Sequence, residues 1–175
     1  MSQDGDLHIR RALVEEADFI ASLATHADVE PFMAVVSAKD PEAFKEEIER
    51  AEREPEHYGR YVIEVEGERA GTMAFEVKNR RSRIAGVYGI MVHPGFRGRR
   101  VADRAARAFA RHLFDDLGYH RLELEVYGFN ERALAHAERA YVREGVKRKA
   151  YWRNDEWVDG VIFGLTQEDL EEGGD

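Results

Sequence analysis

The stretch GVYGIMVHPGFRGRRVA, from Gly86 to Ala102, decides the fold. Its first half is a short apolar run of the kind that forms a buried strand, and Pro94-Gly95 ends that strand. The apolar residues that follow the glycine-containing loop recur every four positions: Val101, Ala105, Phe109 and Leu113. This spacing predicts an amphipathic helix from about Gly98 to Leu117, which ends before Gly118.

The junction between this strand and this helix has the properties of an anion site. Backbone N–H groups at a helix start have no partner within the helix, and the helix dipole adds positive charge there. Gly98 lets the backbone approach a ligand closely, and the small side chain of Ala102 leaves room for it. The loop also carries three arginines: Arg97, Arg99 and Arg100. A diphosphate is the ligand that fits best, and a solvated basic helix start is the alternative.

Two common phosphate-binding motifs do not fit the junction. A Walker loop would need Gly-Lys followed by Ser or Thr, which is absent from this stretch. A dinucleotide fingerprint would need a different glycine spacing and a preceding β-α-β unit, whereas the preceding residues predict a meander of strands.

The rest of the chain predicts a mixed sheet flanked by helices. Strands are expected at residues 7–11, 61–66, 70–77, 86–93, 122–127, 147–153 and 157–165. Helices are expected at residues 14–23, 40–53, 98–117 and from Asn130 onward. The order predicts an α+β fold with a sheet of about seven strands, in which an antiparallel meander is followed by a parallel β-α-β pair.

Composition limits the class of protein. The chain has 175 residues, which predicts a single domain over residues 1–167 followed by an acidic, disordered tail over 168–175. Its formal net charge of −9 argues against a general nucleic-acid binder. No apolar run approaches the ~18 residues of a membrane helix, and the polar N-terminus does not resemble a signal peptide, so we expect a cytoplasmic protein. The chain has no cysteine and no histidines at ligand spacing, so no metal is expected.

The junction resembles motif A of the GNAT superfamily of N-acetyltransferases. That pattern is Val-x-Pro at the end of a strand, then Arg/Gln-x-x-Gly-x-Gly/Ala at a helix start. This chain has Val92-His-Pro94 followed by Arg97-Gly-Arg-Arg-Val-Ala102, so that Arg100 stands where the family usually has glycine. Further along, Asn130-Glu-Arg-Ala133 is similar to the Asn-x-x-Ala that opens the next helix of the family.

Three other segments are similar to the family's patterns. Tyr141-Val-Arg-Glu-Gly145 resembles its Phe-x-x-Glu-Gly, although one residue is missing before Tyr141. Trp157-Val-Asp159 and the segment His26 to Val29 resemble the last strand and the substrate loop of the RimJ/RimL-type branch. The resemblance therefore extends over most of the chain from Leu7 to Leu165.

The resemblance implies an acetyl-CoA-dependent N-acetyltransferase in which a primary amine attacks the thioester directly. Acetyl-CoA would be a co-substrate, and the acceptor a small molecule or a peptide N-terminus. The residues implied in cofactor binding are Ile90, Met91, Val92, Arg97, Gly98, Arg99, Arg100, Val101, Ala102 and Asn130. A backbone N–H of Met91 or Val92 would stabilise the oxyanion.

The groups that move protons are less evident. Many relatives have a tyrosine as the acid seven residues after the motif asparagine, but this chain has Ala137 there. Tyr141 lies one turn further along the same helical face and is the candidate replacement. The other side chains considered near the cleft are Glu76, Tyr88, Glu123, Glu125, His93 and His26.

Two alternatives remain open at this point. The departures at Arg100 and Ala137 would also suit a non-catalytic acyl-CoA-binding module on the same fold. The arginines on the predicted helix at residues 98–117 would suit an RNA-associated protein, although neighbouring acidic residues dilute their charge. The apolar residues Trp152, Trp157 and Phe163 offer area for a homodimer.

Overall fold

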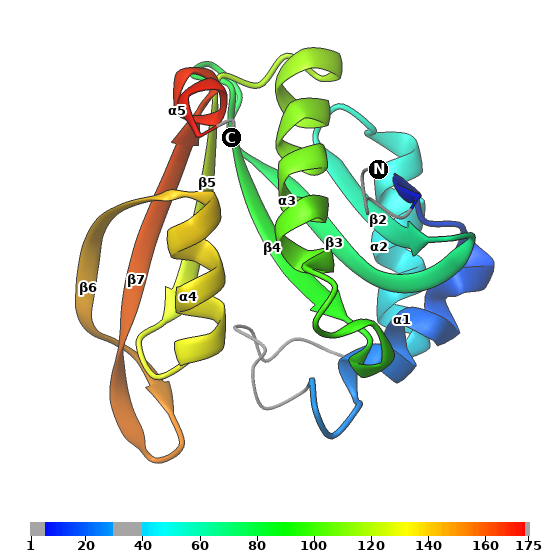
Figure 1. Cartoon of the computed structure of the whole chain (residues 1–175), viewed down its shortest axis with the longest axis horizontal. Helices are drawn as coiled ribbons and strands as arrows, with labels where there is room; N and C mark the ends of the chain where they lie inside the picture. Colours follow the sequence, from blue (N-terminus) through cyan, green and yellow to red (C-terminus); the bar gives the residue numbers. More distant parts are fainter. Residues whose placement is uncertain (1–5, 30–39, 174–175) are drawn as a thin grey trace.

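The computed structural model describes residues 6–29 and 40–173 of the chain. A seven-stranded sheet has the strand order β1-β2-β3-β4-β5-β7-β6 (Figure 1). The strands are β1 (Leu7–Arg11), β2 (Tyr58–Val65), β3 (Glu68–Asn79), β4 (Ile84–Val92), β5 (Arg121–Tyr127), β6 (Val142–Arg153) and β7 (Glu156–Thr166). Neighbouring strands are antiparallel except β4 and β5, which are parallel. The predicted mixed sheet, with its meander and its parallel pair, is confirmed.

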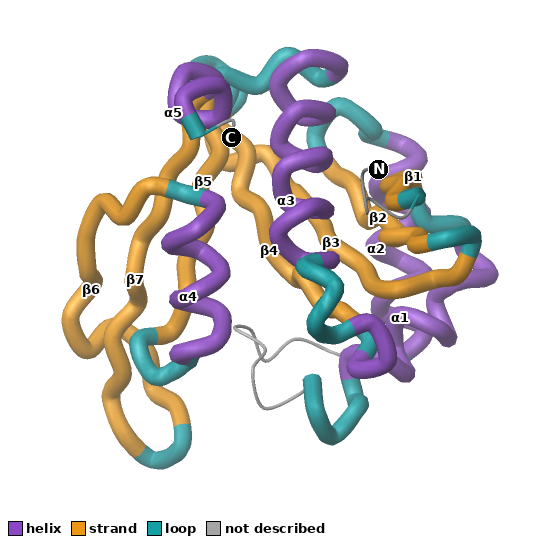
Figure 2. The backbone as a smooth tube through the Cα atoms, viewed as in Figure 1, coloured by secondary structure: helices purple, strands orange, loops and turns teal. Residues whose placement is uncertain are grey.

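Helices cover both faces of the sheet (Figure 2). On one face, α3 (Val101–Arg111) packs against β1 and β4, and α4 (Glu131–Ala140) packs against β5. On the other face, α1 (Ala17–Ala24) and α2 (Pro41–Arg53) pack together with Val62 and Met91. The two faces thus have separate apolar cores, and no helix among the described residues is long and apolar enough to cross a membrane.

Two helices start at the residues expected from the sequence, and each start has a side-chain cap. The side chain of Asp40 accepts a hydrogen bond from the N–H of Ala43 at the start of α2. The side chain of Asn130 does the same for Ala133 at the start of α4.

The helix α3 is shorter than the sequence predicts. It starts at Val101 rather than at Gly98, because the backbone of Arg100 is left-handed, with φ 53° and ψ 31°. It ends at Arg111, where His112–Asp116 continue as one π-helical turn. The apolar spacing persists through this turn, since Leu113 is fully buried, and this persistence made the predicted helix too long.

The parallel strands β4 and β5 pair over only a short length. Their paired positions are Ile84 with Arg121, Ala85 with Leu122 and Gly86 with Glu123. Beyond Gly86 the two strands diverge, and the gap between them widens toward their carboxyl ends (Figure 1). Within the described chain, the last six residues of β4 therefore have a neighbouring strand on one side only, which is β3.

A bulge interrupts β4 at Gly89. On β3, Ala74 pairs with Tyr88 and Thr72 pairs with Met91, so Met73 alone lies opposite both Gly89 and Ile90. Gly89 has a positive φ of 62°, which glycine adopts at little cost.

The C-terminal segment differs from the predicted disordered tail. Gln167–Glu172 form the short helix α5, whose start is fixed by reciprocal hydrogen bonds between Thr166 and Asp169. Leu170 of this helix packs against the core on the α3 side of the sheet. The last two residues of the predicted tail lie outside the described part of the chain.

Candidate active site

The loop before α3 presents the backbone of a helix start without a side-chain cap. Gly98 has φ 79°, and Arg100, at the N-cap position, makes no capping hydrogen bond with its side chain to any described residue. The N–H groups of Val101, Ala102 and Asp103 belong to the first helical turn and have no acceptor within the helix. The start of α3 thus has the donors and the dipole of an anion site.

The position of Arg100 accounts for the glycine that motif A usually has there. Its φ of 53° is left-handed, which glycine adopts freely and arginine only at a cost. The side chain turns outward and is 78% exposed, with Nε 3.7 Å from a carboxylate oxygen of Asp103. The substitution therefore strains the backbone but leaves the helix start uncovered.

The other two arginines of the loop are tied to neighbouring elements. Arg97 donates through Nη2 to the backbone oxygen of Asp28 at 2.8 Å. Arg99 pairs with Glu66 at 3.2 Å, and its guanidinium lies 5.7 Å from the ring centroid of Phe96. Their positive charges remain beside the helix start, and their contacts with Asp28 and Glu66 also connect the loop to neighbouring segments.

A groove of about 730 Å³ runs along α3 from this loop to α5. Its walls are formed by α3, by the end of α4 and by α5, and the arginines among its lining residues are Arg99, Arg100, Arg104, Arg107 and Arg139. The groove is thus basic in a chain of net charge −9. An anionic ligand that starts at the α3 loop could continue along it.

The backbone at Ile90, Met91 and Val92 borders the gap between β4 and β5. The side chains of Ile90 and Val92 pack against the core on the α3 side, whereas Met91 is buried in the core on the α1/α2 side. Because β3 pairs only one edge of this stretch, its other edge faces the gap. The predicted residues Ile90–Val92 and Arg97–Ala102 therefore lie on one strand–loop–helix unit beside the gap.

Asn130 and Tyr141 mark opposite ends of α4. Asn130 is 2% exposed and caps the helix, and Tyr141 follows its last residue, about 15 Å away along the helix axis. The ring of Tyr141 belongs to the core on the α3 side and also lines the groove. Burial raises the pKa of Tyr141, so the hydroxyl stays protonated at neutral pH.

The carboxylates considered from the sequence lie on the face of the sheet that carries α1 and α2. Glu125 accepts hydrogen bonds from Tyr151 and, at 3.0 Å, from Lys147. Glu123 accepts one from Arg121 at 3.1 Å. Glu76 is exposed, and the two histidines His26 and His93 lie together with ring centroids 5.8 Å apart. Glu123 and Glu125 are thus paired with cations, and neither is an isolated base.

Sequence reasoning missed two residues on the same face, Arg60 and Glu47. Arg60 is 4% exposed and forms hydrogen bonds with both carboxylate oxygens of Glu47. The pattern of α2, charged on most faces, gave no signal that one of its glutamates turns inward.

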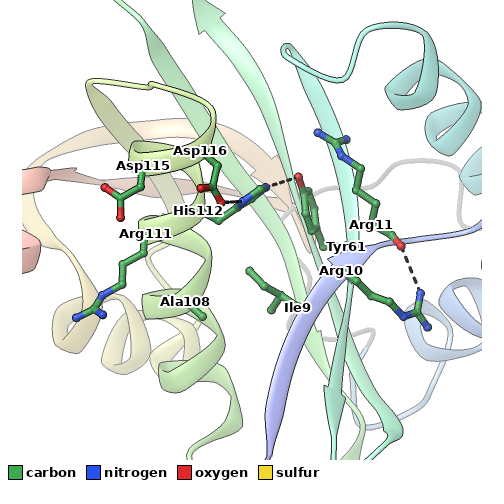
Figure 3. A pocket seen from close by; sticks show the side chains of 9 residues that line it. All are labelled: Ile9, Arg10, Arg11, Tyr61, Ala108, Arg111, His112, Asp115 and Asp116. Atoms are coloured by element: carbon green, nitrogen blue, oxygen red, sulfur yellow. Dashed lines mark hydrogen bonds and ion pairs between the residues drawn. The ribbon is translucent and has the colours of Figure 1, made fainter.

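A second cavity, of about 440 Å³, lies between β1 and the end of α3, away from the gap (Figure 3). At its wall, the hydroxyl of Tyr61 lies 2.8 Å from Nε2 of His112, whose Nδ1 lies 2.6 Å from Asp116. This chain of hydrogen bonds joins β2 to the π-helical turn. Burial raises the pKa of Tyr61, so its hydroxyl stays protonated at neutral pH.

Metal chemistry has no evident site in this structure. Among residues 6–29 and 40–173, no three histidine or acidic side chains come close enough together to hold a metal ion.

The model of the acetyltransferase (GNAT) family matches residues 22–157. The SPbeta prophage-derived uncharacterized N-acetyltransferase YokL of Bacillus subtilis is 29% identical over 94 residues, which are 53% of this chain and 52% of that protein. The match thus spans about half the length of this curated relative.

Solved structures show the same fold at low sequence identity. Spermidine N-acetyltransferase from Vibrio cholerae, in complex with CoA and spermine, has a TM-score of 0.82 at 18% identity, covering 94% of this chain and 98% of that one. The ribosomal-protein-S5-alanine acetyltransferase from Vibrio fischeri has a TM-score of 0.78 at 17% identity, covering 94% of each chain. Together with the family match, which extends over most of the sequence, these findings show that the chain belongs to the GNAT family of N-acetyltransferases, whose members use acetyl-CoA.

Proposed function

We propose that this protein transfers the acetyl group of acetyl-CoA to a primary amine by direct attack of the amine on the thioester. The observation that carries the proposal is the combination of an uncapped helix start at α3 with the gap between β4 and β5. The first feature suits the diphosphate of CoA, and the second leaves a backbone edge on β4 with which the acyl-pantetheine arm would pair.

The cofactor would be bound mainly by backbone groups. The N–H groups of Gly98 to Ala102 would donate to the diphosphate, and the loop arginines would add charge. The pantetheine arm would lie along Ile90–Val92, whose free edge faces the gap, with Asn130 at the start of α4 on its other side. This arrangement places acetyl-CoA on the α3 side and leaves the opposite side of the gap for the acceptor.

The reaction would form one C–N bond and break one C–S bond. The neutral amine attacks the thioester carbon, and a backbone N–H of Met91 or Val92 stabilises the oxyanion. The intermediate then expels the CoA thiolate, and the amine loses its proton to water. Tyr141, as the acid, would give the thiolate a proton and regain one from solvent. Alignment of the two substrates would supply much of the rate.

The acceptor is a primary amine, either small or at a protein N-terminus. Two acetyltransferases with this fold act on spermidine and on the alanine of ribosomal protein S5, as their names state. Membership of the RimJ/RimL-type branch is part of this proposal, and it rests on Trp157–Asp159 and His26–Val29. We also propose that the enzyme works in the cytoplasm.

Binding and turnover can be tested separately. Acetyl-CoA should raise the melting temperature and protect the amides of Arg97–Ala102 from hydrogen exchange. Thiol release should then depend on an amine from a panel of amino acids, polyamines and peptides. Failure of millimolar CoA to cause either effect would refute the proposal. Binding without thiol release for any amine would instead support a non-catalytic acyl-CoA-binding module.

A further inference from the structure

An ion pair between Arg60, which is buried, and Glu47, whose side chain is 26% exposed, contacts the bulge of β4. The guanidinium of Arg60, on β2, donates to Glu47 of α2 through Nε at 3.1 Å and through Nη2 at 2.9 and 3.1 Å. The Arg60 side chain is 3% exposed, and its guanidinium also lies against the rings of Phe44 and Tyr88.

The same ion pair contacts the bulge at two points. Arg60 donates through Nη1 to the backbone oxygen of Gly89 at 3.3 Å. The hydroxyl of Tyr88 donates to Glu47 at 2.8 Å. A Cβ placed on Gly89 would lie only 2.9 Å from Nη1 of Arg60, so the guanidinium packs directly against the glycine backbone.

The bulge changes which way the following residues face. In a regular strand Ile90 would share the face of Tyr88, because side chains alternate with a period of two. Here Tyr88 reaches α2, but Ile90 packs on the α3 side and Met91 is buried on the α1/α2 side. Because of the extra residue, the side chains of Ile90, Met91 and Val92 each lie on the opposite face of the sheet from the one they would have in a regular strand.

The buried charge of Arg60 needs a reason beyond stability. Removing a charged group from water costs much of what its attraction to a partner returns, and apolar residues of similar size often serve as well. An apolar pair could not, however, donate to the carbonyl of Gly89, which the bulge removes from the regular ladder.

We infer that Arg60, held by Glu47 and Tyr88, is a positioning residue that fixes the β4 bulge and thereby the backbone of Ile90–Val92 beside the thioester. The inference rests on the proposed function, because the importance of this backbone follows from acetyl transfer. Burial and the carboxylate of Glu47 raise the pKa of Tyr88, so that its hydroxyl remains a donor throughout the neutral range.

The test compares two tyrosines whose hydroxyls each form a hydrogen bond with one side chain. Tyr88→Phe removes the hydrogen bond to Glu47, and the matched control Tyr61→Phe removes the one to His112, on the opposite face of the sheet from Arg60. Glu47→Gln weakens the clamp, by which we mean the contacts among Arg60, Glu47 and Tyr88, and it keeps the shape of the residue 47 side chain. These mild changes leave Arg60 in place, so the variants should remain folded.

We expect Tyr88→Phe and Glu47→Gln to lower kcat about tenfold or more, because small misplacements of reacting groups are costly. The Kd of CoA should change less than kcat, since the α3 loop, which would hold the diphosphate, is untouched. Amide exchange at Ile90–Val92 should accelerate in these two variants and not in Tyr61→Phe.

Two results would separate the inference from the proposed function. If wild-type protein neither binds CoA nor releases thiol, the proposed function fails. If wild type is active and both clamp variants match Tyr61→Phe in kcat and in amide exchange, the positioning role of Arg60 is wrong. Arg60→Lys supplies a further check. It keeps the positive charge but loses the bidentate geometry, so its kcat should be lower than that of the wild type.

Discussion

The ring of His136, on α4, donates through Nδ1 to the carboxylate of Asp103, on α3, over 2.6 Å. Arg139 donates to the same carboxylate at 2.9 and 3.2 Å. These contacts join the two helices that lie on either side of the gap between β4 and β5. They also neutralise Asp103, whose charge next to the α3 loop would otherwise repel a diphosphate.

Replacing Asp103 by Asn should therefore destabilise the protein by about 1–2 kcal/mol at pH 7, the usual cost of weakening charged hydrogen bonds. Burial disfavours the charge of Asp103, but the hydrogen bonds from Arg139 and His136 outweigh it and lower its pKa. A lowered pKa gives stabilisation that is complete above the ordinary aspartate pKa of about 3.9 and is lost as the pH falls through the folded-state value. Urea unfolding of both proteins between pH 3 and 7 should show the difference shrink below about pH 4. A difference that stays constant over this range would contradict the assignment.

Arg100→Gly should make the protein more stable. The left-handed backbone at this position costs an arginine about 1 kcal/mol, although the flexibility of glycine in the unfolded chain returns part of the gain. The Kd of CoA should rise by no more than about fivefold, the effect of one exposed charge, because the proposed contact is the backbone N–H. Thermal unfolding and calorimetric titration measure the two quantities. A much larger loss of affinity would show that the guanidinium itself binds the cofactor.

Gly98→Ala should have the opposite effect on the same loop. A Cβ at Gly98 meets no described atom within 4 Å, so that its only penalty is the positive φ of 79°. We expect a loss of about 1 kcal/mol in stability and weaker CoA binding as the loop shifts to relieve the strain. Gly145→Ala is the matched control, because its Cβ also meets nothing within 4 Å and its φ is not in the left-handed region. Equal behaviour of the two variants would rule out the conformational role of Gly98.

The parts of this molecule that local patterns control could be predicted from the sequence. The apolar strand ending at Pro94, the caps at Asp40 and Asn130 and the order of elements all depend on neighbours in the chain, and each gave the expected structure. The left-handed backbone at Arg100 was not predicted, because arginine itself gives no such signal and the helix period continues through it. The glycine that motif A usually has at this position would have indicated it.

The contacts of Arg60 with Glu47 and Gly89 were not predicted, for a different reason. Glu47, Arg60 and Gly89 meet only because α2, β2 and β4 come together in the folded sheet. A helix with charges on most of its faces does not reveal which glutamate will be buried. The site residues proposed on β4, on the α3 loop and on α4 still require the ligand experiments described above.

Tyr141→Phe tests the assignment of the proton donor. Within the described chain the Tyr141 hydroxyl has no hydrogen-bond partner, so its removal should leave stability nearly unchanged, within about 0.5 kcal/mol. If Tyr141 protonates the leaving thiolate, kcat should fall about tenfold to a hundredfold, toward the low end for a general acid because a thiolate leaves readily. The Kd of CoA should not change. Tyr119→Phe is the control, since it removes a tyrosine hydroxyl that donates to the backbone oxygen of Glu56, far from the gap. If Tyr141→Phe retains wild-type kcat, the tyrosine only packs against the core, and the thiolate takes its proton from solvent.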